Sequence, residues 1–520
     1  MDTKALRQKV LDLAIRGKLV PQDPNDEPAS VLLERIRQQK KQMVRDGKLK
    51  PKDIKNDTII FVGEDNLHYE KFADGSVKCI EDEIPFDLPE GWEWSRLGTV
   101  AEAIGDGDHQ PPPQTSSGVP FLVISNVSGG QLSFENTRFV SEEYFSQLPE
   151  TRKPRNGDLL FTVTGSYGIP VLVDTDDKFC FQRHIAIVRP CIISNRYFYV
   201  VLGSSYVKSI CDAKATGTAQ KTVGLATLRE LLIPVAPYKE QMQIYAQTQD
   251  ALSIVDSISS DKEDLLNIIE NTKAKILNLA IRGQLVPQDL NDEPASVLLE
   301  RTRSEKEELI RQGKIKRDKK ESVIFRGEDN SYYEKISDKV TQYDVDELPW
   351  GWGVGSFSQC NLFAPETINP SASPDEMFEL YSVPNFEEGV PEIICGREIG
   401  SSKQSICEHD VLVCKINPRI NRVWITGHIT PYQLLGSSEW IVFRNHLLFA
   451  PYLRYYFSSP RFRELILSNV SGVGGSLMRA QPESVKKYPV FIPPYQEQIG
   501  ITERINELFT LLEVIEKSLN

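Results

Sequence analysis

The stretch LAIRGKLVPQDPNDEPASVLLER at Leu13–Arg35 recurs as LAIRGQLVPQDLNDEPASVLLER at Leu279–Arg301. The two copies differ only at positions 18/284 and 24/290. Such self-similarity within one chain indicates an internal duplication, which has to be identified before any local assignment is made. The repeated stretch therefore sets the organisation of the whole 520-residue sequence.

The similarity extends to further landmarks on both sides of a long divergent segment. IIFVGEDNLHYEKFADGSV (Ile59–Val77) resembles VIFRGEDNSYYEKISDKV (Val323–Val340), and LPEGW at 88–92 resembles LPWGW at 348–352. Resemblance then fades, and it returns in IPVAPYKEQ at 233–241 and FIPPYQEQ at 491–498. Each half thus consists of a helix, a conserved linker, a divergent segment and another helix.

Apolar residues recur at heptad spacing in the helical segments, which predicts long helices that pack as coiled coils. The seam positions are Ile244, Ala251, Val255, Ile258, Leu265, Ile269, Ile276 and Leu279 in the centre, Ile501, Ile505, Leu508, Leu512, Ile515 and Leu519 at the C-terminus, and Leu6, Val10 and Leu13 at the N-terminus. The two terminal pieces together match one copy of the central helix. We therefore expect them to close a circular repeat, with the central helix antiparallel to both; a duplication without closure is the alternative.

These landmarks divide the chain into five parts. They are an N-terminal half-helix with its module and linker (1–84), a first variable domain (85–240), a central helix with module and linker (241–348), a second variable domain (349–495) and a C-terminal half-helix (496–520). The variable parts alternate short strands, glycine-rich turns and helices. The predicted fold is α+β: two α/β domains separated by long antiparallel coiled-coil helices in a pseudo-twofold circular repeat.

The repeated stretch also predicts local structure. Gly17 and Gly283 are placed to end the long helices in the left-handed conformation. Asp26 and Asp292 stand near the start of the next helix, and Pro28 and Pro294 are expected in its first turn. Identity of the two copies has two explanations that the sequence leaves open, a shared partner surface or shared internal packing.

Polar side chains gather in the predicted loops of both variable domains, where they are suited to hydrogen bonding with base edges. The candidates are Ser166, Tyr167, Arg183, His184, Thr218, Gln220 and Lys221 in the first domain, and Lys415, Asn417, Arg419, Arg422, Ser476, Arg479 and Gln481 in the second. Each of them alone is also compatible with an ordinary loop residue.

The charge distribution gives mixed indications about nucleic-acid binding. The net charge of −13 counts against nucleic-acid binding. However, residues 85–240 carry 14 Lys/Arg against 17 Asp/Glu, and residues 349–495 carry 12 against 13, so both variable domains are nearly neutral. Residues 35–55 hold nine basic and two acidic side chains. That run is either a solvated helix face and linker or a contact with nucleic-acid phosphate or an acidic partner.

Eight scattered cysteines without a C-x-x-C pair predict free thiols in a reducing, cytoplasmic setting. No apolar run is long enough to span a bilayer, and the charged N-terminus does not resemble a signal peptide. The sequence lacks a phosphate-binding G-x-x-x-x-G-K-[ST] loop, and IPPY at 492–495 lacks the asparagine of a methyltransferase N-P-P-Y loop. GDGDH at 105–109 is interpreted as a polar turn rather than a metal site. We expect no catalytic site, no metal and no cofactor.

The repeated stretch, the GDLLFTVTG turn at 157–165 and the IPVAPYKEQ and IPPYQEQ helix starts resemble the specificity subunits of type I restriction–modification systems, which serve bacterial defence. The resemblance covers essentially the full chain. It implies two target-recognition domains, at 85–240 and 349–495, that each read one half of a split site in double-stranded DNA. It also implies long helices that set the gap, two bound modification (methyltransferase) subunits, and restriction (translocase and nuclease) subunits that join them. Methylation, ATP hydrolysis and cleavage would reside in those partners.

The inserts near 41–84 and 307–346 depart from the simplest members of that family, and their role is open. Two rival functions are a free-standing DNA-binding regulator and a fused methyltransferase. Specific binding by the chain alone would favour the first, and methyl transfer by the chain alone would establish the second.

Overall fold

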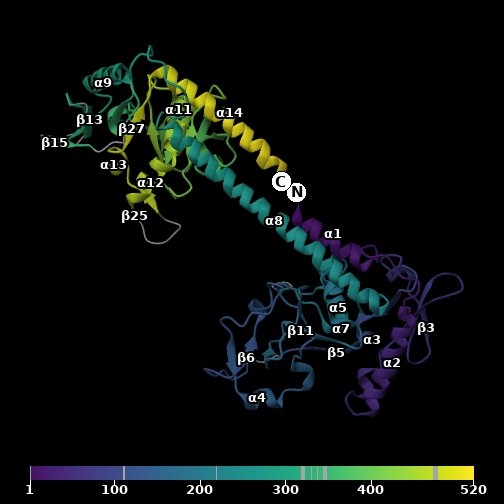
Figure 1. Cartoon of the computed structure of the whole chain (residues 1–520). Helices are drawn as coiled ribbons and strands as arrows, with labels where there is room; N and C mark the ends of the chain where they lie inside the picture. The colour runs from purple at the N-terminus through teal and green to yellow at the C-terminus, as the bar shows by residue number, and fades with distance from the viewer. Residues whose placement is uncertain are drawn as a thin grey trace. The chain divides into compact units, whose positions relative to one another are not determined.

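The computed structural model describes residues 2–108, 112–217, 220–317, 322–329, 331–336, 338–343, 348–471 and 478–519. The chain divides into two compact units, Met1–Lys262 and Glu263–Asn520 (Figure 1). The division falls inside a single long helix, α8 (Tyr238–Ala280). Each unit contains both helices and sheets, so the predicted mixed α and β content is confirmed.

The described residues of unit 1 form seven α-helices before α8. They are α1 (Thr3–Ile15), α2 (Ala29–Arg45), α3 (Leu97–Val100), α4 (Glu142–Gln147), α5 (Asn195–Leu202), α6 (Ser205–Lys214) and α7 (Leu225–Glu230). Its strands are β1 (Ile59–Val62), β2 (His68–Lys71), β3 (Val77–Cys79), β4 (Glu93–Arg96), β5 (Ala101–Asp106), β6 (Val119–Leu122), β7 (Arg138–Val140), β8 (Leu159–Thr162), β9 (Pro170–Leu172), β10 (Cys180–Phe181), β11 (Ile185–Pro190) and β12 (Leu232–Val235). They form sheets in the orders β1-β2-β3, β10-β6-β7, β5-β11-β8-β9 and β12-β4.

Unit 2 follows the same plan after α8. Its helices are α9 (Ala295–Arg311), α10 (Phe357–Cys360), α11 (Ala450–Ser458), α12 (Pro460–Ser468), α13 (Pro482–Val485) and α14 (Tyr495–Leu519). Its strands are β13 (Ser322–Arg326), β14 (Tyr332–Ile336), β15 (Lys339–Gln342), β16 (Gly353–Ser356), β17 (Thr367–Ile368), β18 (Met377–Tyr381), β19 (Glu392–Cys395), β20 (Lys403–Ser405), β21 (Val411–Cys414), β22 (Val423–Ile425), β23 (Gln433–Gly436), β24 (Trp440–Phe443), β25 (Val470–Ser471), β26 (Arg479–Ala480) and β27 (Pro489–Ile492). The sheet orders are β13-β14-β15, β16-β27, β17-β20-β23-β18-β19, β22-β21-β24 and β25-β26.

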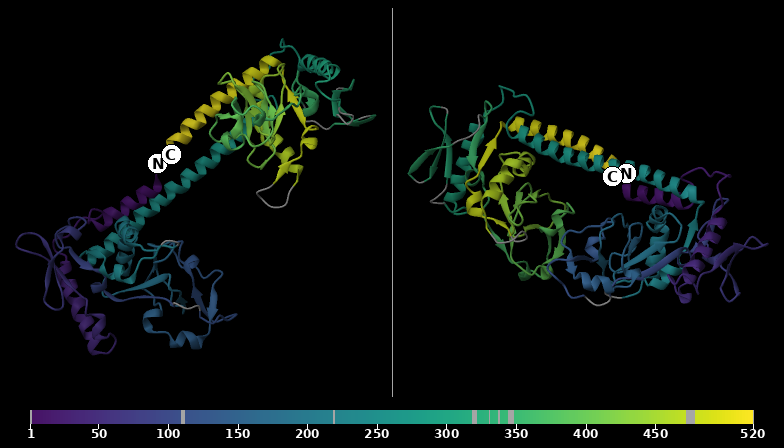
Figure 2. Two further views of the ribbon diagram at one scale, coloured as in Figure 1. Left: turned by 180° about the vertical axis from the view of Figure 1, so that it is seen from behind. Right: turned by 60° about the horizontal axis from the view of Figure 1, so that its bottom comes forward.

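In unit 1, α1 lies along α8 and runs antiparallel to it (Figure 2). Thr3 Oγ1 donates to Ser259 Oγ at 3.4 Å, and Arg7 pairs with Asp256, so residue numbers rise along one helix as they fall along the other. Farther along α1, its apolar residues join those of α8 in the main core of the unit. The helix pair is thus attached to the globular part of unit 1 by its buried end.

In unit 2, α14 packs on the second part of α8. Ile276, Ile501 and Ile505 belong to one buried cluster, and Lys273 Nζ lies 3.0 Å from Glu516 Oε2. The ion pair is partly exposed and lies toward the end of α14, whereas the isoleucines lie next to the globular part. As in unit 1, the apolar contacts are strongest where the helices meet the domain.

Burial varies along the predicted seam. Ile244, Val255, Ile269, Ile276, Ile501 and Ile505 are buried, and Val10, Leu13, Ala251, Ile258, Leu279, Leu508, Leu512 and Leu519 are half-buried. Contrary to the heptad expectation, Leu6, Leu265 and Ile515 are 37%, 43% and 47% exposed. In α1 the buried face is formed by Leu11, Ala14 and Ile15 instead, because this helix packs on α5 and α6 as well as on α8.

The left-handed ends of α1 and α8 are confirmed. Gly17 has φ +62° and Gly283 has φ +65°. A Cβ atom at Gly17 would collide with the ring of Pro89, and one at Gly283 would collide with Pro349. Glycine is therefore required here for two reasons, the backbone conformation and the close approach of the LPxGW motif.

The start of the following helix differs from the prediction by one position. Pro28 and Pro294 are themselves the residues that precede the helix, and no aspartate side chain caps it. The first free amide, of Ala29 or Ala295, donates instead to the carbonyl of Gly91 or Gly351 at 2.8 Å. A carbonyl from the LPxGW motif thus replaces the side-chain cap, because the motif packs directly on this end of the helix.

The thiols behave as the sequence predicts. All eight cysteines are free, and five of them are buried. Burial raises the pKa of Cys180 to about 12 and that of Cys191 to about 11, so both remain protonated at neutral pH. Across the described ranges, no helix is long and apolar enough to cross a membrane.

Candidate nucleic-acid interface

Three loops of unit 1 are held together by backbone hydrogen bonds. The turn after β8 is joined to the segment before β11 by Val163 N, which donates to His184 O at 2.9 Å. It is joined to the loop after α6 by Gly165 N, which donates to Lys221 O at 3.1 Å, and by Val223 N, which donates to Val163 O at 2.8 Å. We call this arrangement the unit 1 junction.

The unit 1 junction collects the candidates that the sequence placed in three separate loops. Ser166, Arg183, Gln220 and Lys221 are exposed, and Tyr167 and His184 are half-buried, whereas Thr218 lies outside the described residues. Since the side chains come from segments up to about 55 positions apart, only the tertiary structure brings them to one place.

Tyr167 is the candidate most engaged in its own unit. Its hydroxyl donates to Asp212 Oδ1 at 2.7 Å, and Lys208 Nζ lies 4.0 Å from the centre of its ring. The hydrogen bond to Asp212 raises the pKa of Tyr167. These contacts hold the turn after β8 against α6 and give Tyr167 a positioning role.

The pKa of the His184 imidazole is lowered, which favours its neutral form. Burial and the neighbouring Arg183 lower the pKa of its imidazole. Gln182 Nε2 lies 3.2 Å from His184 Nδ1. A neutral imidazole has one donor and one acceptor nitrogen, and Arg183 beside it supplies a fork of donors, so the pair can hydrogen bond to base edges.

Unit 2 repeats the same backbone frame. Lys415 N donates to Glu439 O at 3.0 Å, Asn417 N donates to Met478 O at 2.9 Å, and Ala480 N donates to Lys415 O at 2.8 Å. These three bonds correspond one for one to those of unit 1. We call this second arrangement the unit 2 junction.

The two junctions share their backbone and differ in their side chains. Gly165 and Asn417 occupy equivalent positions, and both have positive φ, +74° and +46°. Glu439 stands where unit 1 has His184, and Met478 stands where it has Lys221. A common frame thus carries two different sets of polar groups.

Ion pairs neutralise part of the unit 2 set. Arg422 Nε lies 3.2 Å from Glu387 Oε1, and Arg479 Nη2 lies 3.1 Å from Glu439 Oε1. Among the candidates Arg419, Arg479 and Gln481 are exposed, Lys415, Asn417 and Arg422 are half-buried, and Ser476 lies outside the described residues. The most accessible donors of the unit 2 junction are therefore Arg419 and Gln481.

Sequence reasoning missed Glu439. Its carbonyl is part of the unit 2 junction frame and its carboxylate orients Arg479. A carboxylate at such a position can accept a hydrogen bond from the amino group of cytosine. The alignment of SSEWIVF at 437–443 with QRHIAIV at 182–188 was the available signal, but it becomes visible only once β24 and β11 are matched.

Asp108 of the GDGDH segment is part of a polar network. It accepts hydrogen bonds from Arg152 Nη1 at 2.9 Å and Tyr144 Oη at 2.5 Å, and its carbonyl accepts from Arg183 N at 3.1 Å. His109 lies outside the described residues. Within the described part of the chain, no group of three His, Cys, Asp or Glu side chains is placed to hold a metal ion. Asp108 instead positions the backbone of Arg183.

Comparison with known proteins gives consistent matches. Residues 89–270 match the family model of the type I restriction modification DNA specificity domain. The chain is 25% identical to the type I restriction enzyme EcoEI specificity subunit of Escherichia coli, over 99% of this chain and 90% of that protein. It is 29% identical to the EcoAI specificity subunit of Escherichia coli, over 67% of this chain and 61% of that protein.

This chain is also similar to a chain of a solved structure. That structure's description concerns the structural basis of complex assembly and conformational transition of the type I R-M system. The identity is 15%, the TM-score is 0.49, and the match covers 84% of this chain and 94% of that chain. On the sequence matches, residues 89–270 resemble a type I restriction modification DNA specificity domain, and the chain is similar over nearly its whole length to a specificity subunit of a type I restriction enzyme.

Proposed function

We propose that this chain is the DNA sequence-recognition subunit of a type I restriction–modification complex, in which each variable domain reads one half of a bipartite site. The observation that carries the proposal is the pair of junctions, one backbone frame built twice with different polar side chains. Equal frames present their side chains to DNA in equivalent ways. Because the side chains differ, the two half-sites need not be the same sequence.

The helices α1, α8 and α14 set the separation of the half-sites in this proposal. The two terminal helices close the circular repeat against α8, and the recognition domains contact two major-groove segments about one helical turn, or about 34 Å, apart. Two modification subunits dock beside the duplicated modules, and restriction subunits join that core. The chain itself performs no catalysis, and methyl transfer, ATP hydrolysis and DNA cleavage take place in the partners.

The test is methylome sequencing of cells that express the modification subunits with and without this chain. We expect a split, adenine-methylated motif only when the chain is present. Arg183→Ala with Gln220→Ala should relax one half of the motif, and Arg419→Ala with Gln481→Ala the other half. The assignment would be contradicted if neither variant relaxed a defined half of the motif, or if both variants relaxed the same half.

A further inference from the structure

A cationic surface lies outside the two junctions, at the end of α2 and in the loop before β1. We call residues 41–57 the cationic connector. Six of its side chains are exposed cations without an ion pair in the described structure: Lys41, Arg45, Lys48, Lys50, Lys52 and Lys55. Its two exposed carboxylates, Asp46 and Asp53, accept hydrogen bonds from Gln42 Nε2 and from the amide of Lys50. Both keep their negative charge, but the six cations outnumber them, so the surface is net positive.

The start of the connector is anchored by a buried lysine. Lys40 is 2% exposed, and its Nζ donates to Asp57 Oδ1 at 2.9 Å and to the carbonyls of Gly98 and Thr99 at 3.1 Å. Burial raises the pKa of Asp57 to about 6, although Lys40 opposes the shift. The two ends of the connector are thus tied to each other and to α3 of the first variable domain.

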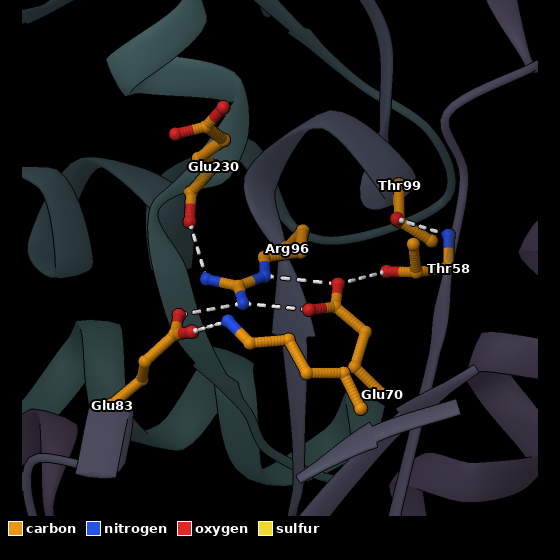
Figure 3. A network of polar contacts seen from close by, with 7 residues as sticks. Thr58, Glu70, Glu83, Arg96, Thr99 and Glu230 are labelled. Carbon is orange, nitrogen blue, oxygen red and sulfur yellow. Dashed lines mark hydrogen bonds and ion pairs between the residues drawn. The ribbon is translucent and has the colours of Figure 1, made fainter. Parts of the chain in front are cut away.

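A second network fixes the small sheet that follows (Figure 3). Arg96 on β4 donates to both carboxylate oxygens of Glu70 at 3.0 and 2.7 Å and to Glu83 Oε2 at 2.8 Å. Thr58 Oγ1 donates to Glu70 Oε1 at 2.6 Å, and Thr58 N donates to Thr99 Oγ1 at 3.2 Å. The insert is therefore tied to the first variable domain by polar contacts of Thr58, Glu70 and Arg96.

In the described part of the second copy, residues 307–317, acidic side chains pair with some of the cations. Glu307 stands where the first copy has Lys41, and the ion pairs Arg311–Glu308 and Arg317–Glu307 use two of its arginines. The anchor is nevertheless kept, since Lys306 Nζ donates to Ser358 O at 2.5 Å. The anchor is thus duplicated, whereas among the described residues the second copy has two exposed cations without an ion pair, Lys314 and Lys316, against six in the connector.

This asymmetry discriminates between two kinds of partner. Two identical protein subunits, one on each module, would need the same contact surface twice. Duplex DNA presents a continuous row of phosphates, and a contact to it requires no matched counterpart elsewhere. Exposed lysines on an anchored segment are also suited to contact phosphates as point charges, without reading the bases.

We propose that the cationic connector binds the phosphate backbone of duplex DNA outside the recognised bases and supplies a sequence-independent part of the affinity. The proposal rests on the proposed function in one respect, that the chain acts on double-stranded DNA. It adds a contact from unit 1 for which the described part of unit 2 has fewer unpaired cations. The DNA flanking one half-site is therefore held more strongly than the DNA flanking the other.

The test compares charge-removing and charge-keeping variants of the full-length chain in its assembled complex. The variant Lys41→Gln/Lys48→Gln/Lys52→Gln/Lys55→Gln is measured against the same four positions changed to Arg. Binding to a random-sequence duplex is followed by fluorescence anisotropy over a series of salt concentrations. We expect the magnitude of the slope of log K against log[salt] to fall by about 3.6 for the Gln variant, at about 0.9 for each of four phosphate contacts, and not to fall for the Arg variant.

A control in unit 2 changes Arg311 and Lys314, the counterparts of Arg45 and Lys48, to Gln and should leave the slope nearly unchanged. An equal slope in wild type and the unit 1 Gln variant would overturn the proposal, as would an equal decrease per removed charge in the unit 2 control. Unchanged DNA binding with weakened subunit assembly would assign the surface to an acidic protein. Methylome sequencing separates the two proposals, because the Gln variant should keep the motif, whereas failure of the proposed function would leave no motif in wild type.

Discussion

At the scale of single residues, two buried glutamates organise the duplicated modules. Trp92 Nε1 donates to Glu240 Oε2 at 2.9 Å, and Gln22 Nε2 donates to Glu240 Oε1 at 3.2 Å. In unit 2, Trp352 and Gln288 contact Glu497 in the same way, at 3.0 and 3.3 Å. Each glutamate ties the first turn of a long helix to the repeated stretch and to the LPxGW motif. Internal packing thus explains much of the identity between the copies.

Glu240→Ala should destabilise unit 1 by about 1–3 kcal/mol, because it leaves the Trp92 and Gln22 donors without their acceptor. Glu497→Ala should have the same effect in unit 2. Urea unfolding gives the size of the loss, and hydrogen–deuterium exchange shows which unit loses protection. Glu240→Gln keeps an acceptor and should cost less; an equal loss in both variants would contradict the hydrogen-bond explanation.

The same carboxyl group predicts a pH dependence. Burial raises the pKa of Glu240 above 4.5, although the hydrogen bonds from Gln22 and Trp92 oppose this shift. Because the folded state then holds the proton more tightly than the unfolded chain, this contribution to stability is complete at low pH and is lost as pH rises through the folded pKa. The free energy of unfolding of wild type should therefore fall relative to that of Glu240→Gln as the pH rises above about 4.5. Parallel pH profiles would refute this.

At the scale of elements, the ends of the long helices are decided by packing as much as by local conformation. Gly17 ends α1 with φ +62° and faces the ring of Pro89. Gly47 follows α2 with a similar φ of +71°, but a Cβ there would meet nothing within 4 Å. Comparison of Gly17 with Gly47 therefore distinguishes two free-energy costs of adding a side chain. One comes from the left-handed backbone, and the other from the close approach of Pro89.

Gly47→Ala should cost only the backbone penalty, about 1 kcal/mol. Gly17→Ala should cost distinctly more, about 2–4 kcal/mol, since the added methyl group forces the LPxGW motif away from the end of the helix. Thermal unfolding of the two variants provides the comparison. Equal shifts in Tm would mean that Pro89 moves aside easily and that close packing is not the reason for this glycine.

At the scale of the whole molecule, comparison of the two copies of the module distinguishes residues that serve internal packing from residues that can contact a partner. Ala29 and Ala295 are buried and serve the fold, whereas Ser30 and Ser296 are identical, exposed and without a described side-chain contact. Exposed identity of this kind is expected where two equal partner subunits dock on one chain, which supports the proposed pair of modification subunits.

Ser30→Arg should therefore leave complexes that hold one modification subunit, and Ser296→Arg should remove the other one. The double variant should retain neither, while the fold of the chain is kept, because both serines are exposed. Native mass spectrometry of the purified complexes measures the stoichiometry. Two bound subunits in the double variant would show that the exposed identity has no docking role.

The sequence by itself determined the duplication, the helical segments and the left-handed glycines, because these depend on local periodicity and on backbone conformations that few residues tolerate. Only the tertiary structure decided that carbonyls of Gly91 and Gly351 replace the predicted aspartate caps, and that Glu439 joins the unit 2 junction. The physical reason is the same in each case: these hydrogen bonds join groups that are distant in the sequence, and their geometry exists only after the sheets and helices have packed.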